Sequence, residues 1–405
     1  MSLIIEQRKQ QPPSFVIRLM QLTWTRIRES PATKIYTTAV VIASILGIVL
    51  EILIAVAHKE ATNDLWQSIG QGRLPSSPFS PVNPNNGRID TLINLRRLMD
   101  ENVFFILFYI FQLYLGIDAV VRQSVIQLIA HACNSFVCVI LALVQLGETL
   151  KWNHRTSDTY RTIDANSFYS ASHYEIALAS FMGVFTCIFT YICFKLIHQF
   201  GWNTYKRIGA DPKLQRRFKK CQLFLLSLKL DGFFHIVFSI FWVVVMTQEG
   251  YHQGSLASKV WYSMHLILTV VQFPAPFIAR QGLRTERTAF MIPFLVLHAL
   301  LVIDFIIILQ QSSTVWTFWV LAGRFTFYSI PKDNGTIVLG AIVTHNFGKG
   351  LKPYTQRLFD KNYRYRLDPT ANPTIVEKNN QKADTAWVID DEDEEESDPI
   401  HRDNH

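Results

Sequence analysis

The chain has 405 residues, of which 49% are apolar and 18% charged, and its formal net charge is +7 at pH 7. These totals alone do not separate a soluble protein from a membrane protein. The distribution does, because the apolar residues gather in runs that reach the ~20 residues needed to cross a bilayer. A helix of a soluble domain keeps a polar stripe for solvent. These runs have none, which excludes an ordinary soluble domain.

Seven runs predict membrane-spanning helices. They cover residues 35–57, 103–121, 124–146, 176–197, 223–246, 260–278 and 289–309. The strands of a β-barrel would be shorter and would alternate in polarity. The predicted fold class is therefore all-α, a polytopic transmembrane helix bundle with seven to eight crossings.

The first 34 residues form a basic segment ahead of the first run. That run is too long for the apolar part of a cleavable signal peptide, so we expect it to remain as an anchor. Within the basic segment, "FVIRLMQLTWTRIRE" predicts an amphipathic helix that lies on the membrane surface. A disordered basic arm is the alternative.

The distribution of Lys and Arg predicts a cytoplasmic N-terminus, because basic loops are retained on that side. The connection between the fourth and fifth runs, "NTYKRIGADPKLQRRFKKCQ", carries seven cations and one acid, Asp211. The loops expected on the opposite side, 148–175 and 251–259, carry few or balanced cations. We expect the basic connection to bind anionic lipid headgroups, at about 1 kcal/mol per residue. Its cations are Lys206, Arg207, Lys213, Arg216, Arg217, Lys219 and Lys220.

The chain after the seventh run predicts an eighth, poorly formed crossing, because further Lys and Arg beyond it should also stay in the cytoplasm. One candidate is 313–330, which Arg324 interrupts; the other ends at Val343 and is broken by "PKDNG". Seven crossings with a lumenal tail is the alternative. Asn334 begins the one usable N-glycosylation sequon and would report on the topology.

Three regions follow from these boundaries: a cytoplasmic basic segment (1–34), the helix bundle (35–346) and a cytoplasmic, largely disordered tail (347–405). The tail ends in the acidic run "VIDDEDEEESDP". Before the second crossing, "IDTLINLRRLMDE" predicts an amphipathic helix that leads into it.

Ionisable residues inside a membrane are functional candidates by default. Lys229 can extend its long side chain to the interface. Asp231 lies about 12 Å deep at ~1.5 Å of rise per residue and cannot, and His235, four residues on, shares its face. Asp118 on the second run can pair with Lys229. These four residues form the candidate intramembrane polar site. We expect these polar groups to hold the helices together; a role in transport or proton relay is the alternative.

The remaining ionisable groups in the runs have no evident common location. Glu51, His131, His265, His298 and Asp304 are scattered in depth. Pro274 and Pro276, in "QFPAPF", we interpret as a simple helix end near the cytoplasmic face.

The sequence contains no signature of catalysis. Its five cysteines lie in or next to the runs, so we expect buried, inert thiols and no structural disulfide. No spacing resembles a zinc site, and there is no phosphate loop, H-E-x-x-H or G-x-S-x-G. We therefore expect no metal, no cofactor, no nucleic-acid partner and no enzymatic activity.

Two motifs resemble those of a fungal family of uncharacterised Golgi apparatus membrane proteins. They are "GADPKLQRRFKKCQLFLLSLKLDGFF" and "NFGKGLKPY", and the likeness spans residues 36–354 in layout. "PKDNG" interrupts the region ahead of the second motif, which departs from the family pattern. The resemblance implies a multi-pass protein of the Golgi membrane with no assigned activity and no catalytic residues to carry over.

The favoured hypothesis for function is a trafficking or scaffold role. It would act through the basic connection and the acidic tail, with membrane lipids and cytoplasmic trafficking proteins as partners. The alternative is a small-solute or proton-coupled transporter that uses Asp231 and His235.

Overall fold

The computed structural model describes residues 15–69, 87–159, 166–208, 211–248, 251–312 and 335–349. Within these ranges the chain forms helices and no strand. The predicted all-α fold class is confirmed.

The described residues contain six helices long and apolar enough to cross a membrane, and a bent pair that would add a seventh crossing if it is one broken span rather than a re-entrant loop. The six are α2 (Pro31–Ile69), α3 (Gly87–Arg122), α4 (Val125–Thr159), α5 (Asn166–Ile208), α6 (Pro212–Gln248) and α9 (Thr288–Ser312). The pair is α7 (Leu256–Val271) and α8 (Ala275–Thr285). Each of the seven predicted runs lies in one of these helices or in the bent pair, so the polytopic architecture is confirmed.

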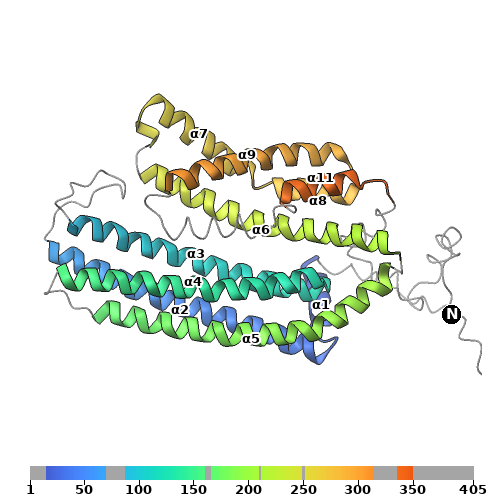
Figure 1. Ribbon diagram of the computed structural model, residues 1–405, viewed down its shortest axis with the longest axis horizontal. Coiled ribbons are helices and arrows are strands. Elements are labelled where there is room, and N and C mark those ends of the chain that lie inside the picture. Colours follow the sequence, from blue (N-terminus) through green and yellow to red (C-terminus); the bar gives the residue numbers. More distant parts are fainter. Residues whose placement is uncertain are drawn as a thin grey trace, which may run out of the picture. The chain divides into compact units, whose positions relative to one another are not determined.

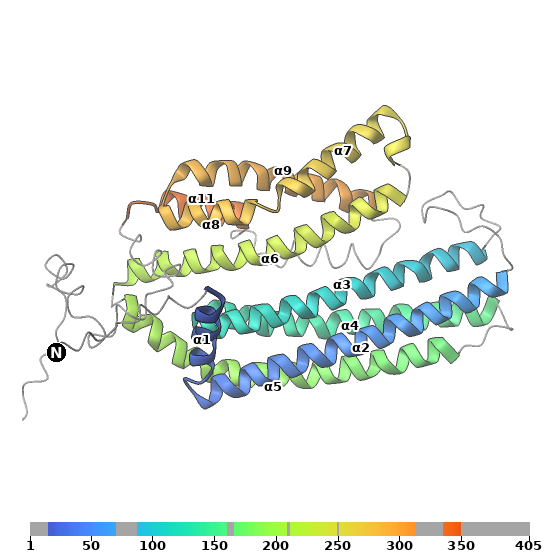
Figure 2. The same ribbon diagram turned by 180° about the vertical axis from the view of Figure 1, so that it is seen from behind.

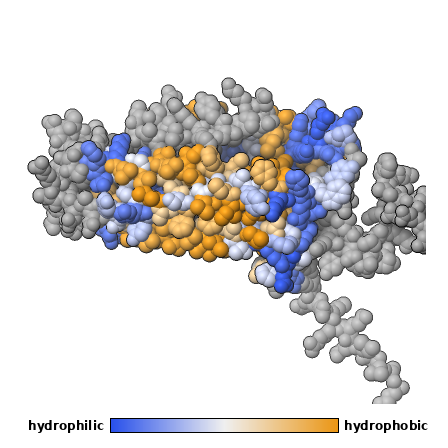
Figure 3. Space-filling view, turned by 60° about the horizontal axis from the view of Figure 1, so that its bottom comes forward, coloured by the Kyte–Doolittle hydropathy of each residue, from blue (hydrophilic) through white to orange (hydrophobic). Residues whose placement is uncertain are grey.

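The outer surface of these helices suits lipid. Large apolar side chains are exposed along it, among them Ile45 (54%), Val184 (60%) and Ile292 (54%). Figure 3 shows apolar residues over the middle of the face that it presents and hydrophilic residues toward its ends. Such an extended apolar surface is costly in water and ordinary against hydrocarbon tails.

The helices form two sets, which both views separate (Figures 1 and 2). The four-helix set is α2–α5, whose members are long and continuous. The broken-helix set is α6–α9 together with the short α11 (Thr336–His345). In the broken-helix set, α11 packs against α6 and α9, and α7 and α8 both contact α6.

Close approach between α2 and α3 holds the four-helix set together. A Cβ atom added to Gly47 would lie 2.8 Å from the ring of Tyr109, so a larger residue does not fit there. Nearer the start of α2, the Tyr36 hydroxyl lies 2.8 Å from His131 Nδ1 of α4. Both rings of this second contact are fully buried.

An aromatic seam joins the two sets. Phe111 of α3 stacks on Phe233 of α6 with ring centroids 4.2 Å apart, and Phe108 lies 5.9 Å from Phe234. Offset aromatic pairs at such distances add about 0.5–1.5 kcal/mol beyond the area that they bury. The seam gives the two sets a packed, apolar boundary.

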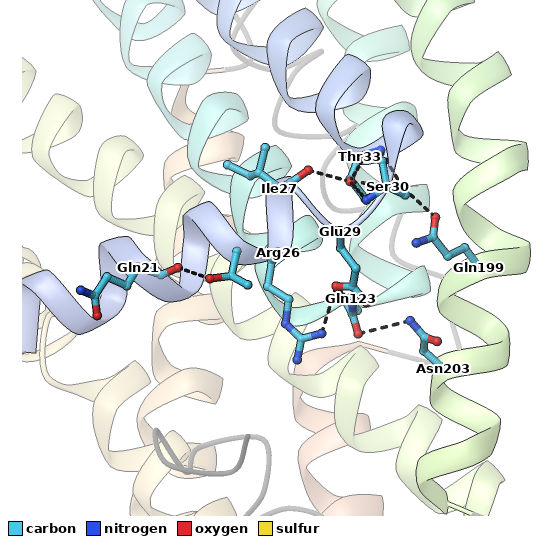
Figure 4. Close-up of polar contacts among 10 residues, drawn as sticks. Gln21, Arg26, Ile27, Glu29, Ser30, Thr33, Gln123, Gln199 and Asn203 are labelled. Carbon is cyan, nitrogen blue, oxygen red and sulfur yellow. Dashed lines mark hydrogen bonds and ion pairs between the residues drawn. The ribbon is translucent and has the colours of Figure 1, made fainter. Parts of the chain in front are cut away.

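The segment "FVIRLMQLTWTRIRE" forms α1 (Phe15–Ile27), so the predicted helix is confirmed and the disordered arm is wrong. Figure 2 shows α1 crosswise at one end of the bundle. Figure 4 shows the contacts that fix the turn after it. Glu29 accepts hydrogen bonds from Arg26 (3.2 Å) and from Gln123 of the α3–α4 connection (2.6 Å).

Two predicted loops are mostly helical. α4 continues to Thr159 and α5 begins at Asn166, which corrects the expected loop 148–175. α5 also continues to Ile208 and α6 begins at Pro212, so the basic connection is mainly two helix ends. The length of an apolar run reflects the thickness of the hydrocarbon core. The helix itself can extend beyond the run into the headgroup region, because its backbone hydrogen bonds do not depend on apolar side chains. For the same reason α3 includes the predicted helix ahead of the second crossing.

The predicted eighth crossing is described only in part. α11 has ten residues, which is about 15 Å of helix and half of a ~30 Å core. Residues 313–330 with Arg324, the sequon at Asn334 and the acidic tail lie outside the described residues. The eighth crossing therefore stays a prediction.

All five cysteines are free thiols. Cys138, Cys193 and Cys221 are buried, as expected. Cys133 and Cys187 are exposed, so the expectation of buried thiols is wrong for these two. They lie on the outward faces of α4 and α5. A uniformly apolar run does not indicate which of its residues face inward and which face outward.

Candidate functional site

Asp231 lies near the middle of α6 and joins three helices. Its carboxylate accepts a hydrogen bond from the hydroxyl of Thr336 at the start of α11. His298 of α9 places Nε2 3.5 Å from the same carboxylate oxygen. All three side chains are buried. Asp231 therefore sits where the halfway point of one long helix meets the beginning of a short one.

The beginning of α11 suits a carboxylate. The first amide groups of a helix lack partners within it and give that end a partial positive charge. Gly335 caps α11 without a side-chain hydrogen bond, so no residue of the cap takes up this charge. Gly340 brings α11 close, since an added Cβ would lie 2.7 Å from Leu295 of α9 and 3.2 Å from Phe224 of α6.

A second helix break lies at the same level of α6. α7 ends at Val271, and α8 starts at Ala275 at an angle of 43° to it. A Cβ added to Gly232, the neighbour of Asp231, would lie 3.6 Å from Pro276. The interpretation of "QFPAPF" as a simple helix end is wrong, because the chain resumes as a helix. Pro274 and Pro276 fall at the first turn of α8, where the missing amide hydrogens cost nothing.

His235 lies next to Asp231 on α6 and contacts the same neighbour. Its ring centroid is 5.4 Å from that of His298 and 5.5 Å from that of Phe305. The expectation that Asp231 and His235 share one face is met. They meet through His298 rather than through a hydrogen bond to each other.

A buried histidine–aspartate pair continues this polar row. His265 of α7 places Nδ1 2.7 Å from Asp304 Oδ2 of α9 and Nε2 3.2 Å from the backbone oxygen of Ser239. Each ring nitrogen thus lies within hydrogen-bond distance of an oxygen acceptor. The sequence indicated no common location for His265, His298 and Asp304. In the structure they lie in one row with Asp231 and His235.

The row follows one face of α6. Asp231, His235 and Ser239 are spaced by four residues, and Ser239 donates a hydrogen bond to Gln272 Oε1 (3.4 Å) at the end of α7. A spacing of four keeps residues on one side of a helix. This spacing was the signal in the sequence that would have added Ser239. We call the group the Asp231 cluster; its members are Asp231, His235, Ser239, His265, Gln272, His298, Asp304 and Thr336.

Lys229 and Asp118 lie elsewhere, at the seam between the two sets. They form an ion pair, so the predicted pairing is confirmed. Asp118 also binds Arg122 (2.8 Å). With its amide turned to suit both, Gln127 donates to Asp118 (2.9 Å) and accepts from Lys229 (2.6 Å). The extension of Lys229 toward the membrane interface stays a prediction.

The basic connection lies at the same end of the bundle as α1. Lys213, Arg216, Lys219 and Lys220 are exposed on the first turns of α6. Arg217 instead donates to the backbone oxygen of Lys349, 2.8 Å away. The chain after α11 therefore returns to this end. Lys206 and Arg207 belong to the last turn of α5, and their side chains lie outside the described residues.

Within the described part of the chain, no three His, Cys, Asp or Glu side chains come together as a metal ion would require.

Comparison with known proteins supports the membrane architecture. The chain is similar to a Golgi apparatus membrane protein of Schizosaccharomyces pombe, which belongs to an uncharacterised family. The two are 23% identical over 276 residues, which is 62% of this chain and 76% of the yeast protein. The resemblance that the two motifs indicated is thereby confirmed. No family model and no solved structure matches the chain.

Proposed function

We propose that this chain is a Golgi membrane transporter for a small solute, with the Asp231 cluster as its binding site, and not an enzyme. One observation carries the proposal: a buried carboxylate meets the beginning of a half-length helix, beside a break in a second helix. Unpaired backbone groups at membrane depth are tolerated only where protein or water satisfies them. In secondary transporters such broken helices hold the substrate and coupling ions near the membrane midplane.

The chemistry of the cluster indicates the class of solute. Asp231 offers an acceptor with negative charge, and His298 and His235 beside it can gain or lose a proton. A solute with a positive charge or hydrogen-bond donors fits these groups. Proton exchange at the histidines would couple its movement to a pH gradient.

The location and orientation are part of the same proposal. The similarity to the yeast protein supports the Golgi membrane. The exposed cations at the start of α6 support a cytoplasmic N-terminus. We expect a tagged N-terminus to be digested by protease added outside sealed Golgi vesicles. Protection of that tag would contradict the orientation.

Flux measurements on the reconstituted protein test the transport proposal. Liposomes with a pH-sensitive dye inside would be given amino acids, polyamines or neutral sugars in turn. We expect one of the first two classes to dissipate an imposed pH gradient with the unaltered protein. Asp231→Asn should abolish this flux, and Asp211→Asn, which changes an exposed acid at the start of α6, should retain it. Equal fluxes for Asp231→Asn and the unaltered protein would contradict the proposal.

The trafficking or scaffold role remains the second candidate. The exposed lysines at the start of α6 favour it, because they present positive charge at the membrane edge. In that case deleting the acidic residues 390–396 should relocate the protein in cells, and Asp231→Asn should leave both location and partners unchanged. The two variants therefore separate the candidates.

A further inference from the structure

The four-helix set contains a second buried polar network, separate from the Asp231 cluster. It lies toward the end of the set opposite α1 and uses one or two side chains from each of the four helices. Every member is at most 1% exposed. The members are Glu51 and His58 of α2, Asn102 of α3, Gln145 and Thr149 of α4, and Glu175 of α5.

The hydrogen bonds of this network run in one direction. Gln145 Nε2 donates to Asn102 Oδ1 (2.8 Å), and Asn102 Nδ2 lies 3.1 Å from His58 Nδ1. An amide nitrogen can only donate, so Nδ1 accepts and the hydrogen of a neutral His58 is on Nε2. That nitrogen faces Thr149 Oγ1 at 3.2 Å, and Thr149 donates to Glu175 Oε1 at 2.6 Å. The chain of donors therefore ends on a carboxyl group.

The other end of the network is also a carboxyl group. Gln145 Nε2 lies 3.4 Å from Glu51 Oε2 as well as bonding to Asn102. Glu51 and His58 are seven residues apart on α2, two turns along one face, which is about 10 Å at ~1.5 Å per residue. Two buried acids are thus linked by hydrogen-bonding side chains, with His58 3.5 Å from Glu175 Oε1.

The network has too few hydrogens for its acceptors. Each nitrogen donor in it has a partner, whereas Glu51 Oε1, Glu175 Oε2 and Gln145 Oε1 have none. An ionised carboxylate left unpaired in hydrocarbon is very costly. A carboxylic acid is neutral and supplies a hydrogen to such a site. The side chains that make up the network include no Lys or Arg to balance two negative charges.

We propose that Glu51 and Glu175 form a proton-binding site, with His58 and Thr149 positioned to donate hydrogen bonds toward the carboxyl group of Glu175. On binding, a proton carried by hydronium adds to a carboxylate oxygen, which forms a carboxylic acid and leaves a water molecule. On release, the O–H bond breaks and the proton passes to water. This site does not depend on the Asp231 cluster and goes beyond the transport function proposed for it.

Other titratable groups surround the two acids and belong to the same balance. Tyr109 of α3 and Cys138 of α4 are within electrostatic reach of Glu51. Glu148 of α4 is within reach of Glu175, and the two glutamates of the site influence each other. Glu101, next to Asn102 in α3, is buried as well. Lys151 of α4 in turn lies within electrostatic reach of Glu148.

Infrared difference spectroscopy of the whole protein in lipid nanodiscs tests the site. Spectra recorded at acid and alkaline pH should show a protonated-carboxyl band that shifts in heavy water. Glu51→Gln and Glu175→Gln keep the size and the hydrogen-bonding capacity of the side chain, and each should reduce this band. Glu60→Gln, an exposed residue of α2, is the matched control and should leave it unchanged.

Two results would overturn the proposal. One is a band of full intensity in both Glu51→Gln and Glu175→Gln, with the helical fold verified by circular dichroism. The other is loss of the band when sodium replaces choline at constant pH, which would assign the site to a sodium ion. Neither result bears on the flux expected from the Asp231 cluster.

Discussion

The two sets of helices handle buried polar groups in opposite ways. In the four-helix set the helices stay continuous past the polar network, and side chains from all four satisfy one another. In the broken-helix set the polar row lies where α7 and α11 begin or end. A continuous helix offers only side chains to a site, whereas a broken one adds free backbone groups and a partial charge. We infer that the first set is the rigid part and that the second is the part that binds the solute and moves.

The largest expected effect comes from the His265–Asp304 pair of the broken-helix set. His265→Leu leaves the buried carboxyl group of Asp304 without this partner, and breaking a buried pair from one side costs about 3–5 kcal/mol of unfolding free energy. Asp304→Asn keeps an oxygen facing His265 and should cost clearly less. Thermal unfolding followed by circular dichroism in detergent measures both. Equal losses of unfolding free energy in the two variants would show that the contact between His265 and Asp304 adds nothing to stability beyond packing.

Gly340→Leu attacks the docking of α11. The new side chain meets Leu295 and Phe224, and overpacking of this kind costs about 1–3 kcal/mol. Gly183→Leu on α5, where nothing lies within 4 Å of an added Cβ, is the control and should be close to neutral. Hydrogen exchange should show the loss in α11 and leave α2–α5 protected. Equal loss of protection in α11 and in α2–α5 would show that the two sets of helices do not respond separately.

The seam between the sets should carry a measurable coupling. A double-mutant cycle of Asp118→Asn and Lys229→Met is expected to give about 1 kcal/mol, within the range for polar pairs in membrane bundles. The control cycle is the more exposed pair of Arg26 and Glu29, for which about 0.3 kcal/mol is expected. A seam coupling no larger than the control would mean that Lys229 is held by solvation and not by its partner.

The smallest effect is expected where the chain returns beside the basic connection. Arg217→Ala removes the hydrogen bond to the backbone of Lys349, which is worth about 0.5–1 kcal/mol or less on an exposed surface. Exchange of the amides that follow α11 should speed up slightly. Arg216→Ala, an exposed neighbour on α6, should not change it. Equally faster amide exchange in both variants would show that the hydrogen bond from Arg217 to Lys349 does not stabilise this segment.

The sequence predicted the crossings well because their signal is length. Each of the seven apolar runs became a membrane-length helix or bent pair. It did not predict α11 as a half-length helix or the break beside Gly232. A helix of ten residues has no length signal, and a Pro pair reads alike at the end of a helix and in its interior.

The polar groups were predicted less well, for a physical reason. Hydropathy ended the first run at residue 57 and began the fourth at 176, which left His58 and Glu175 outside the membrane. Backbone hydrogen bonding extends both helices beyond those limits, and the two side chains turn inward. The seven-residue spacing of Glu51 and His58, and the four-residue spacing of Gln145 and Thr149, place each pair on one helix face. The partners across helices depend on packing that no spacing reveals.

We expect the Asp231 cluster to reach water, whereas the packed interior of the four-helix set around Ser135 does not. Labelling of introduced cysteines tests this expectation most directly, in a chain whose five native cysteines are replaced. Thr336 and Ser135 are equally buried, at 3% and 1% exposure, one in each set. Thr336→Cys should react with a membrane-impermeant thiol reagent in sealed vesicles, and Ser135→Cys should not. Equal reactivity at the two positions would contradict this expectation.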